Sequence, residues 1–256
     1  MPTLTRVSAT AVALLFFLAA PAMADGYDKD AFAKYVAGDY AAAVANAAAV
    51  GGAENLALAA RALNAAAYIG DDRKESRQLA NRALGYAEEA IRLEPDFLEA
   101  HLEAAIGLSL RAANMAPTRA LILNLPGRSR RHMDTALALD PRSFWALSTS
   151  AAWRLEVARR GGGAVFGADT ELGYEEFMKA RELAPANVVV AYECALRLIA
   201  SKRAEWRPPA LEALDAALAG VPESAFEQKM QERAQGLAAA IKAGPNAEAA
   251  YVSAQP

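Results

Sequence analysis

The sequence predicts an all-α fold in which antiparallel helix pairs stack into a solenoid or bundle, with long insertions inside some pairs. Three observations carry this prediction. Alanine makes up 66 of the 256 residues, about a quarter of the chain, and it is the best helix former and a poor strand former. Aromatic residues, which sheets favour, account for only 7%. One type of helix ending also recurs along the chain.

Composition excludes several other classes of protein. Hydrophobic residues make up 54% of the chain and the net charge is only -3, so most of the chain should fold rather than stay disordered. With 16 glycines and one cysteine, the chain is neither collagen-like nor a disulfide scaffold. The weak negative charge gives no reason to expect nucleic acid as a partner. The length allows one large domain, two smaller ones or an extended stack.

Residues 1–24 have the features of a secretory signal peptide. Arg6 supplies the positive charge near the start, and residues 9–20 form an uncharged apolar run. Ala22 and Ala24 form the A-x-A pattern that precedes a cleavage site. The apolar run is shorter than the roughly 20 residues that a membrane span needs. We therefore expect cleavage after Ala24, no transmembrane anchor in the mature chain, and a periplasmic or secreted protein.

The recurring ending has the form Ala-x-x-Leu-x-Pro. It starts at Ala90, Ala136 and Ala180, at intervals of 46 and 44 residues. The alanine allows a neighbouring helix to approach closely, the leucine fills the space between helices, and the proline stops the helix. We therefore expect these three alanines to lie at close helix crossings.

These endings, with the turn Gly38-Asp39-Tyr40, resemble the tetratricopeptide repeat (TPR). The resemblance implies stacked helix pairs with a concave surface that binds a partner. The signal segment and the long insertions are also loosely similar to the T-component proteins associated with TRAP solute transporters. That similarity implies an envelope or transport protein as a partner.

The helical domain is predicted over 25–243, followed by a frayed tail over 244–256. The expected pairs are 27–37 with 39–50, 54–69 with 73–94, 97–113 with 128–139, 143–160 with 170–183, and 187–203 with 209–219, before a capping helix over 223–243.

Two insertions separate the helices of consecutive pairs. The first, 114–128, contains the apolar run Leu121, Ile122 and Leu123, and the second, 161–173, contains Val165 and Phe166 in a glycine-rich context. The first run either packs on neighbouring helices or forms a pocket or docking surface. The second is either a flexible connection or a loop that folds over a ligand.

The helix over 143–160 carries the other candidate site residues. Trp153, Glu156 and Arg160 follow the spacing i, i+3, i+7 and share a face. They form either a binding face or a packed tryptophan beside a local ion pair. Because both insertions leave the same side of adjacent pairs, we expect Leu121, Leu123 and Phe166 to lie next to this face.

A further cluster, Arg128, Arg130, Arg131 and His132, is either a solvated helix start or a surface that recognises an acidic ligand or partner. Cys194 lies in a helical pattern and is expected to be a buried, inert thiol.

No catalytic, cofactor or metal motif is present in the sequence. Two functional hypotheses therefore lead, beside a third, that the protein is a purely structural element in envelope assembly. The first is a non-catalytic exported scaffold that docks another envelope protein. The alternative is a carrier that holds an apolar small molecule or lipid in a cavity covered by the insertions.

Overall fold

The computed structural model describes residues 26–255 and confirms the all-α fold, with no strand in that range. The predicted signal peptide lies outside the described residues. The helices are α1 Lys29–Val36, α2 Tyr40–Val50, α3 Gly52–Ile69, α4 Arg73–Leu93, α5 Leu98–Ala113, α6 Pro117–Ile122, α7 Leu125–Leu139, α8 Phe144–Arg159, α9 Gly163–Phe166, α10 Thr170–Leu183, α11 Val188–Ala200, η1 Ala204–Trp206, α12 Arg207–Ala219, α13 Ala225–Ala243 and α14 Pro245–Ala254.

Short polar side chains start many of these helices. Each accepts a hydrogen bond from a backbone N–H of the first turn, which satisfies a donor that would otherwise have no partner. The capping residues are Asp28, Asp39, Asp72, Ser143, Asp169, Asn187 and Ser224. The predicted proline stops also hold, because α4, α7 and α10 each end two residues before their proline.

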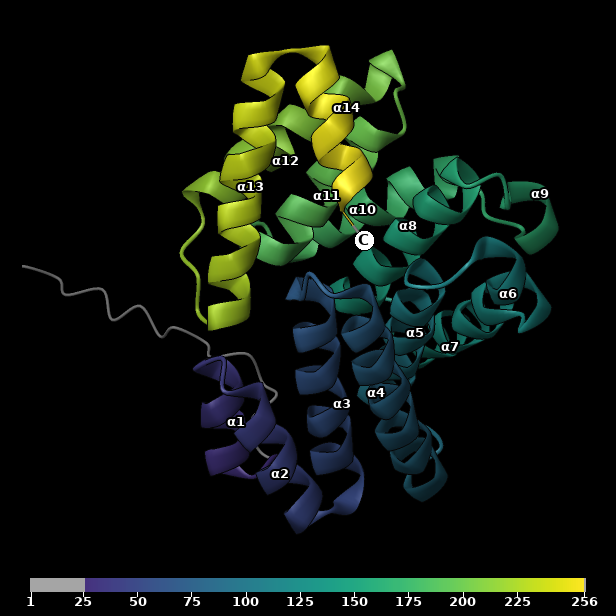
Figure 1. Cartoon of the computed structure of the whole chain (residues 1–256), viewed down its shortest axis with the longest axis vertical. Helices are drawn as coiled ribbons and strands as arrows, with labels where there is room; N and C mark the ends of the chain where they lie inside the picture. Colours follow the sequence, from purple (N-terminus) through teal and green to yellow (C-terminus); the bar gives the residue numbers. More distant parts are fainter. Residues whose placement is uncertain (1–25, 256) are drawn as a thin grey trace, which may run out of the picture.

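The helices pack as antiparallel pairs in chain order: α1 with α2, α3 with α4, α5 with α7, α8 with α10, α11 with α12, and α13 with α14. Figure 1 shows the first pairs in the lower half of the molecule and the last pairs in the upper half. Ala90, Ala136 and Ala180 are all fully buried, as the repeated ending predicts. An ion pair between Arg154 and Glu176, with Nε and Oε2 3.1 Å apart, joins α8 to α10 within the core.

The C-terminal segment differs from the sequence prediction. Residues 244–256 were expected to fray, but Pro245–Ala254 form α14, which packs on α13. The hydroxyl of Tyr251 donates a hydrogen bond of 2.6 Å to the carbonyl of Arg233, and its ring lies close to Gly236, where any side chain would collide with it. The last helix is therefore held by an aromatic side chain that fits against a glycine.

Helix α13 also contacts α3, so the stack of pairs turns back on itself. Arg233 donates from Nη2 to the carbonyl of Tyr68 at 3.0 Å, and its guanidinium lies over the Tyr68 ring. Phe226 packs edge-on against the same ring, with the centroids 6.0 Å apart. The first helices of the pairs consequently surround a common interior. Among the described residues, no helix is both long enough and apolar enough to cross a membrane.

Candidate ligand cavity

A cavity of about 380 Å³ lies between the inner helices α3, α5, α8 and α11. Tyr35 of α1 and Phe226 of α13 also line it. Apolar side chains form much of the wall, among them Ala65, Leu102, Ile106, Leu110, Trp145, Ala152, Val157 and Val189. Ligand sites of about 300–1,000 Å³ with mostly apolar walls hold molecules of drug size, so this cavity has room for one small molecule.

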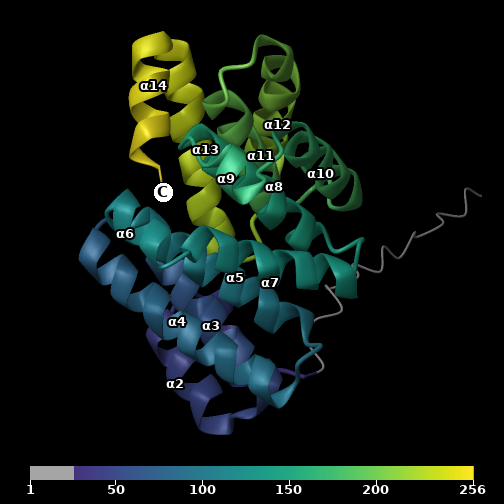
Figure 2. The same cartoon turned by 90° about the vertical axis from the view of Figure 1, so that its right-hand side faces the viewer.

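Five of the six predicted site residues line this cavity. Trp153 and Glu156 come from α8, Arg160 follows its end, Leu121 comes from α6 and Phe166 from α9. The two insertions therefore reach the same cavity, and Figures 1 and 2 show α6 and α9 on the same side of the molecule.

Leu123 is the exception among the six. It follows the last residue of α6 and is 37% exposed, and it is not among the residues of the cavity wall. Successive residues of the short helix α6 point in different directions. Leu121 therefore reaches the cavity, while Ile122 and Leu123 are exposed.

Glu156 is the centre of one charged cluster in the wall. Its carboxylate accepts hydrogen bonds from Arg159, at 2.8 and 2.6 Å, and from Arg160, and Arg197 Nη1 lies 3.4 Å away. Burial raises the pKa of Glu156, but the three arginines outweigh this effect and lower it to about 2. The carboxylate is therefore ionised at any ordinary pH.

The same cluster continues onto α3 through Glu193 of α11. Arg197 Nε lies 3.2 Å from the Glu193 carboxylate, which also accepts a hydrogen bond from the hydroxyl of Tyr68. Burial and the neighbouring Glu193 raise the pKa of Tyr68, so its hydroxyl keeps its proton.

A second charged cluster lies between α3 and α5. Arg61 Nε is 3.1 Å from the Glu103 carboxylate, and Asn64 donates to the other carboxylate oxygen at 2.9 Å. Burial raises the pKa of Glu103 against the opposing effects of Arg61 and Asn64. Arg61, Arg160 and Arg197 thus stand against Glu103, Glu156 and Glu193, so the cavity wall has a formal charge of zero.

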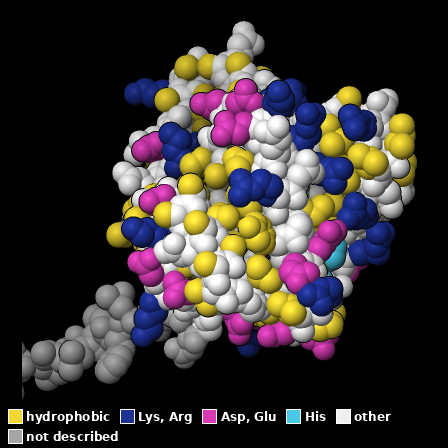
Figure 3. All heavy atoms as spheres, turned by 60° about the horizontal axis from the view of Figure 1, so that its bottom comes forward, with side chains coloured by type: hydrophobic (Ala, Val, Ile, Leu, Met, Phe, Trp, Pro, Cys, Tyr) yellow, Lys and Arg dark blue, Asp and Glu magenta, His cyan; other side chains and the backbone are white. Residues whose placement is uncertain are grey.

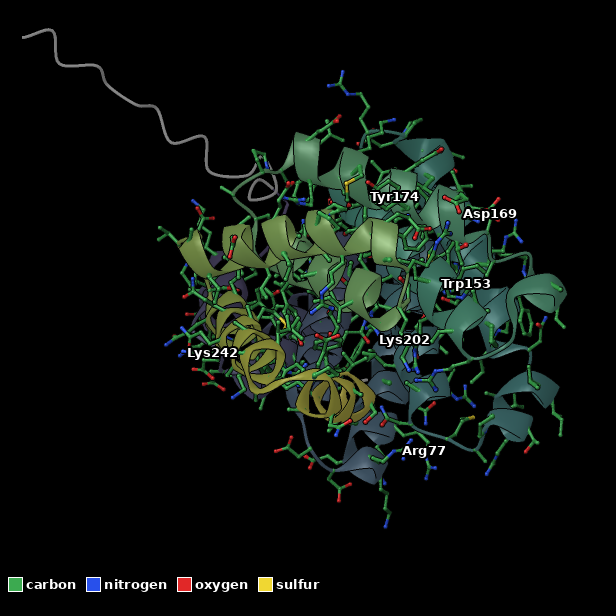
Figure 4. All side chains as sticks on the ribbon, turned by 90° about the horizontal axis from the view of Figure 1, so that it is seen from above. Arg77, Trp153, Asp169, Tyr174, Lys202 and Lys242 are labelled. Carbon is green, nitrogen blue, oxygen red and sulfur yellow. The ribbon has the colours of Figure 1, made fainter. Side chains whose placement is uncertain are left out.

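One hydrogen-bond donor in the wall has no partner among the described residues. Trp153 is 6% exposed, and its indole Nε1 is buried without a hydrogen bond. The ring packs against Met133, Ala168 and the side chain of Phe166. A buried donor without a partner costs about 1–3 kcal/mol. Figure 4 shows Trp153 among the helices, while Arg77 and Lys242 lie toward the edge.

A comparison with protein-family models gives a match over residues 24–242 to the family described as regulator of microtubule dynamics protein 1-3. The chain belongs to this family. No curated protein shows significant similarity to it.

Membership in the regulator of microtubule dynamics family corrects the predicted relationship. The resemblance to TPR proteins and to TRAP T-components is wrong, because the matching family is neither of these. The alanine, leucine and proline of the repeated ending serve close packing and helix termination, which any stack of antiparallel helix pairs needs. The pattern therefore indicated the packing correctly and the family incorrectly.

Most polar residues of the cavity wall were not predicted from the sequence. Arg61, Asn64 and Tyr68 lie at i, i+3 and i+7 on α3, and Glu193 and Arg197 lie at i and i+4 on α11. Each set places polar groups on one face of a helix that is otherwise rich in apolar residues. That spacing can be read from the sequence. The ion pair between Arg61 of α3 and Glu103 of α5 cannot, because the two residues lie 42 positions apart.

Other reactive groups lie outside the cavity wall. Cys194 is fully buried, and burial raises the pKa of its thiol to about 12. His101 and His132, which are far apart in the sequence, meet with their Nδ1 atoms 3.1 Å apart, and His101 Nε2 lies 2.7 Å from the carbonyl of Pro95. Within residues 26–255 there is no group of three or more His, Cys, Asp or Glu that could hold a metal ion.

A second depression, of about 460 Å³, lies at the start of α4. Arg73, Lys74 and Arg77 line it together with residues 114–117. Arg73 and Lys74 are exposed, and Arg73 donates to the carbonyl of Ala113 at 2.9 Å. This depression is open to solvent, whereas the cavity between the inner helices has walls on several sides.

Proposed function

We propose that this protein binds one uncharged, largely apolar small molecule in the cavity between α3, α5, α8 and α11, and acts as its carrier. The observation that carries the proposal is Trp153, which lines a largely apolar cavity and whose buried indole N–H has no partner among the described residues. A ligand with a neutral oxygen acceptor and an apolar body satisfies both features.

The charges of the wall support an uncharged ligand. The arginines and glutamates that line the cavity are paired with each other, so a charged ligand would have to compete with an existing partner. Breaking a buried pair such as that of Arg197 and Glu193 costs several kcal/mol. The same pairing supports binding rather than catalysis, because general acid–base chemistry needs a group that is available to exchange a proton.

The proposed place of action is outside the cytoplasm, after cleavage at Ala24. The signal-like features of residues 1–24 support it, and the family match covers the chain only from residue 24. N-terminal sequencing of exported protein should give Asp25 as the first residue. An intact Met1 on exported protein would contradict cleavage.

Native mass spectrometry of the protein purified from its own host tests the carrier proposal. We expect a bound species of small-molecule mass that is released by collisional activation. Ala152→Phe, which places a ring in the cavity, should abolish the adduct, and Ala138→Phe, on an exposed position of α7, should retain it. Equal adducts in both variants, or none in the unmodified chain, would argue against the proposal.

A second measurement tests the role of the indole N–H. The chain has three tryptophans, so nitrogen-15 NMR should give three indole signals, and Trp153→Phe identifies one of them. Adding 2-dodecanone should shift that signal downfield, because its ketone accepts a hydrogen bond, whereas dodecane should not. Equal responses to the ketone and the alkane would exclude the hydrogen bond.

A further inference from the structure

The insertion helices α6 and α9 leave large apolar side chains uncovered beside the cavity. Ile122 is 83% exposed, Val165 77%, Leu121 51% and Leu123 37%. We name these four residues the apolar rim. Leu121 itself and Phe166, the neighbour of Val165, line the cavity, so the rim borders its edge. Isolated exposed apolar residues are common, but four on two neighbouring insertions mark a surface that contacts something.

Arginines accompany the apolar rim. Residues 114–135 contain four arginines (119, 128, 130 and 131) and a single acid, Asp134, which gives this segment a formal charge of +3 in a chain of net charge -3. Arg119 and Arg131 are exposed. Figure 3 shows hydrophobic side chains beside a row of Lys and Arg along the right-hand edge, the side on which α6 and α9 lie in Figure 1.

This combination selects one type of partner. A second copy of the chain would bring two basic rims together, and their charges would repel. A groove-binding peptide needs a concave surface, whereas Ile122 and Val165 protrude from short helices and are mostly exposed. Apolar side chains flanked by arginine are the features by which protein surfaces enter the interface of an anionic bilayer.

We propose that the apolar rim, with Arg119 and Arg131, docks on the surface of an anionic lipid bilayer. Ile122 and Val165 then insert among the lipid headgroups while the arginines pair with lipid phosphates. Docking in this orientation turns the edge of the cavity toward the apolar phase, which gives a poorly soluble ligand a path that avoids water. The docking itself does not depend on the proposed cavity ligand.

Vesicle flotation of the full chain tests this surface. Vesicles of phosphatidylcholine alone are compared with vesicles that also contain 30 mole per cent phosphatidylglycerol. We expect binding only to the anionic vesicles, and weaker binding as salt is raised. Ile122→Ser combined with Val165→Ser should reduce the partition coefficient at least tenfold, because the inserted apolar area is lost. Arg119→Gln combined with Arg131→Gln should reduce it roughly 30-fold.

Matched controls come from the other end of the molecule. Val221→Ser removes a side chain that is 80% exposed between α12 and α13, and Lys242→Gln removes an exposed cation. Both controls should bind like the unmodified chain. Residues 1–25 are the same in every variant, so they cannot produce a difference between them. All substituted positions are exposed, and equal melting temperatures will show that the variants fold.

Three results would overturn the proposal. The first is equal binding by the rim and control variants, and the second is equal binding to the two vesicle types. The third is concentration-dependent dimerisation in sedimentation velocity that the rim variants abolish, because the occupant would then be a second copy. Retention of the host-derived adduct by the non-docking variants would show that docking and cavity binding are separate properties.

Discussion

Replacing Glu156 by glutamine removes the charge at the point where three arginines meet. The pKa of Glu156 falls from 4.5 to about 2 in the folded protein, which corresponds to roughly 3 kcal/mol in favour of the ionised form. Arg159 and Arg160 are partly exposed and solvent screens them, so we expect a loss of about 2 kcal/mol for Glu156→Gln at pH 7.

The stability difference between the unmodified chain and Glu156→Gln should depend on pH. A carboxyl whose pKa is lower in the folded than in the unfolded state stabilises the fold fully above about pH 4.5, and this stabilisation disappears as the pH falls through 2. Thermal unfolding followed by circular dichroism should therefore show the variant melting about 4–8 °C lower at pH 7. The difference should shrink steadily from pH 4.5 down to pH 3.

Glu89→Gln is the matched control, because Glu89 pairs with Arg92 on the exposed face of α4 and should leave the melting temperature unchanged. A difference between unmodified chain and Glu156→Gln that is the same at pH 7 and pH 3 would refute the electrostatic reasoning. In that case shape or packing, rather than charge, would be what glutamine disturbs.

Three further predictions concern the core and the closure of the stack. Ala136→Leu should overpack a fully buried crossing and cost about 1–3 kcal/mol in urea unfolding, whereas Ala138→Leu on the exposed side of the same helix should cost less than about 0.5 kcal/mol; equal costs would show that the crossing has room. Cys194 should resist iodoacetamide at pH 8 in the native protein and react after unfolding, and rapid native labelling would show that it is not buried. Arg233→Met, which keeps the length of the side chain but not its bond to Tyr68, should speed amide exchange in α13 relative to the other helices; unchanged exchange would mean that Phe226 alone holds the contact.

The sequence predicted those features that depend on local chemistry. The prolines located the ends of α4, α7 and α10, because proline stops a helix through its own backbone. The alanines of the same endings marked buried positions, because their small volume allows another helix to approach. Each insertion joins the first helix of a pair to the second, so both were predicted to leave the same side of the stack and to approach Trp153. Residues of both insertions line the cavity.

What the sequence did not predict depends on contacts between distant segments. Tyr251 and Gly236 hold α14 in place, and neither residue alone indicates a helix after Gly244-Pro245. The pairing of Arg61 with Glu103 requires the relative rotation of two helices, which composition does not contain. Leu123 was predicted in the site together with Leu121. The chain changes direction at the end of α6, and only Leu121 lines the cavity.

The contact between Arg233 and Tyr68 joins residues 165 positions apart, and this separation determines when the cavity is completed during synthesis. Helices α1 to α12 pack mostly with their neighbours in the chain, so they can assemble progressively as they emerge. The wall contributed by Phe226 arrives only when α13 has been made, and the entropy of closing so long a loop must be overcome at that step. Until then the nascent protein presents the apolar faces of α3, α5 and α8 to its surroundings. A chain that stops before α13 should therefore be fully helical yet aggregate, and it should lack a closed binding site.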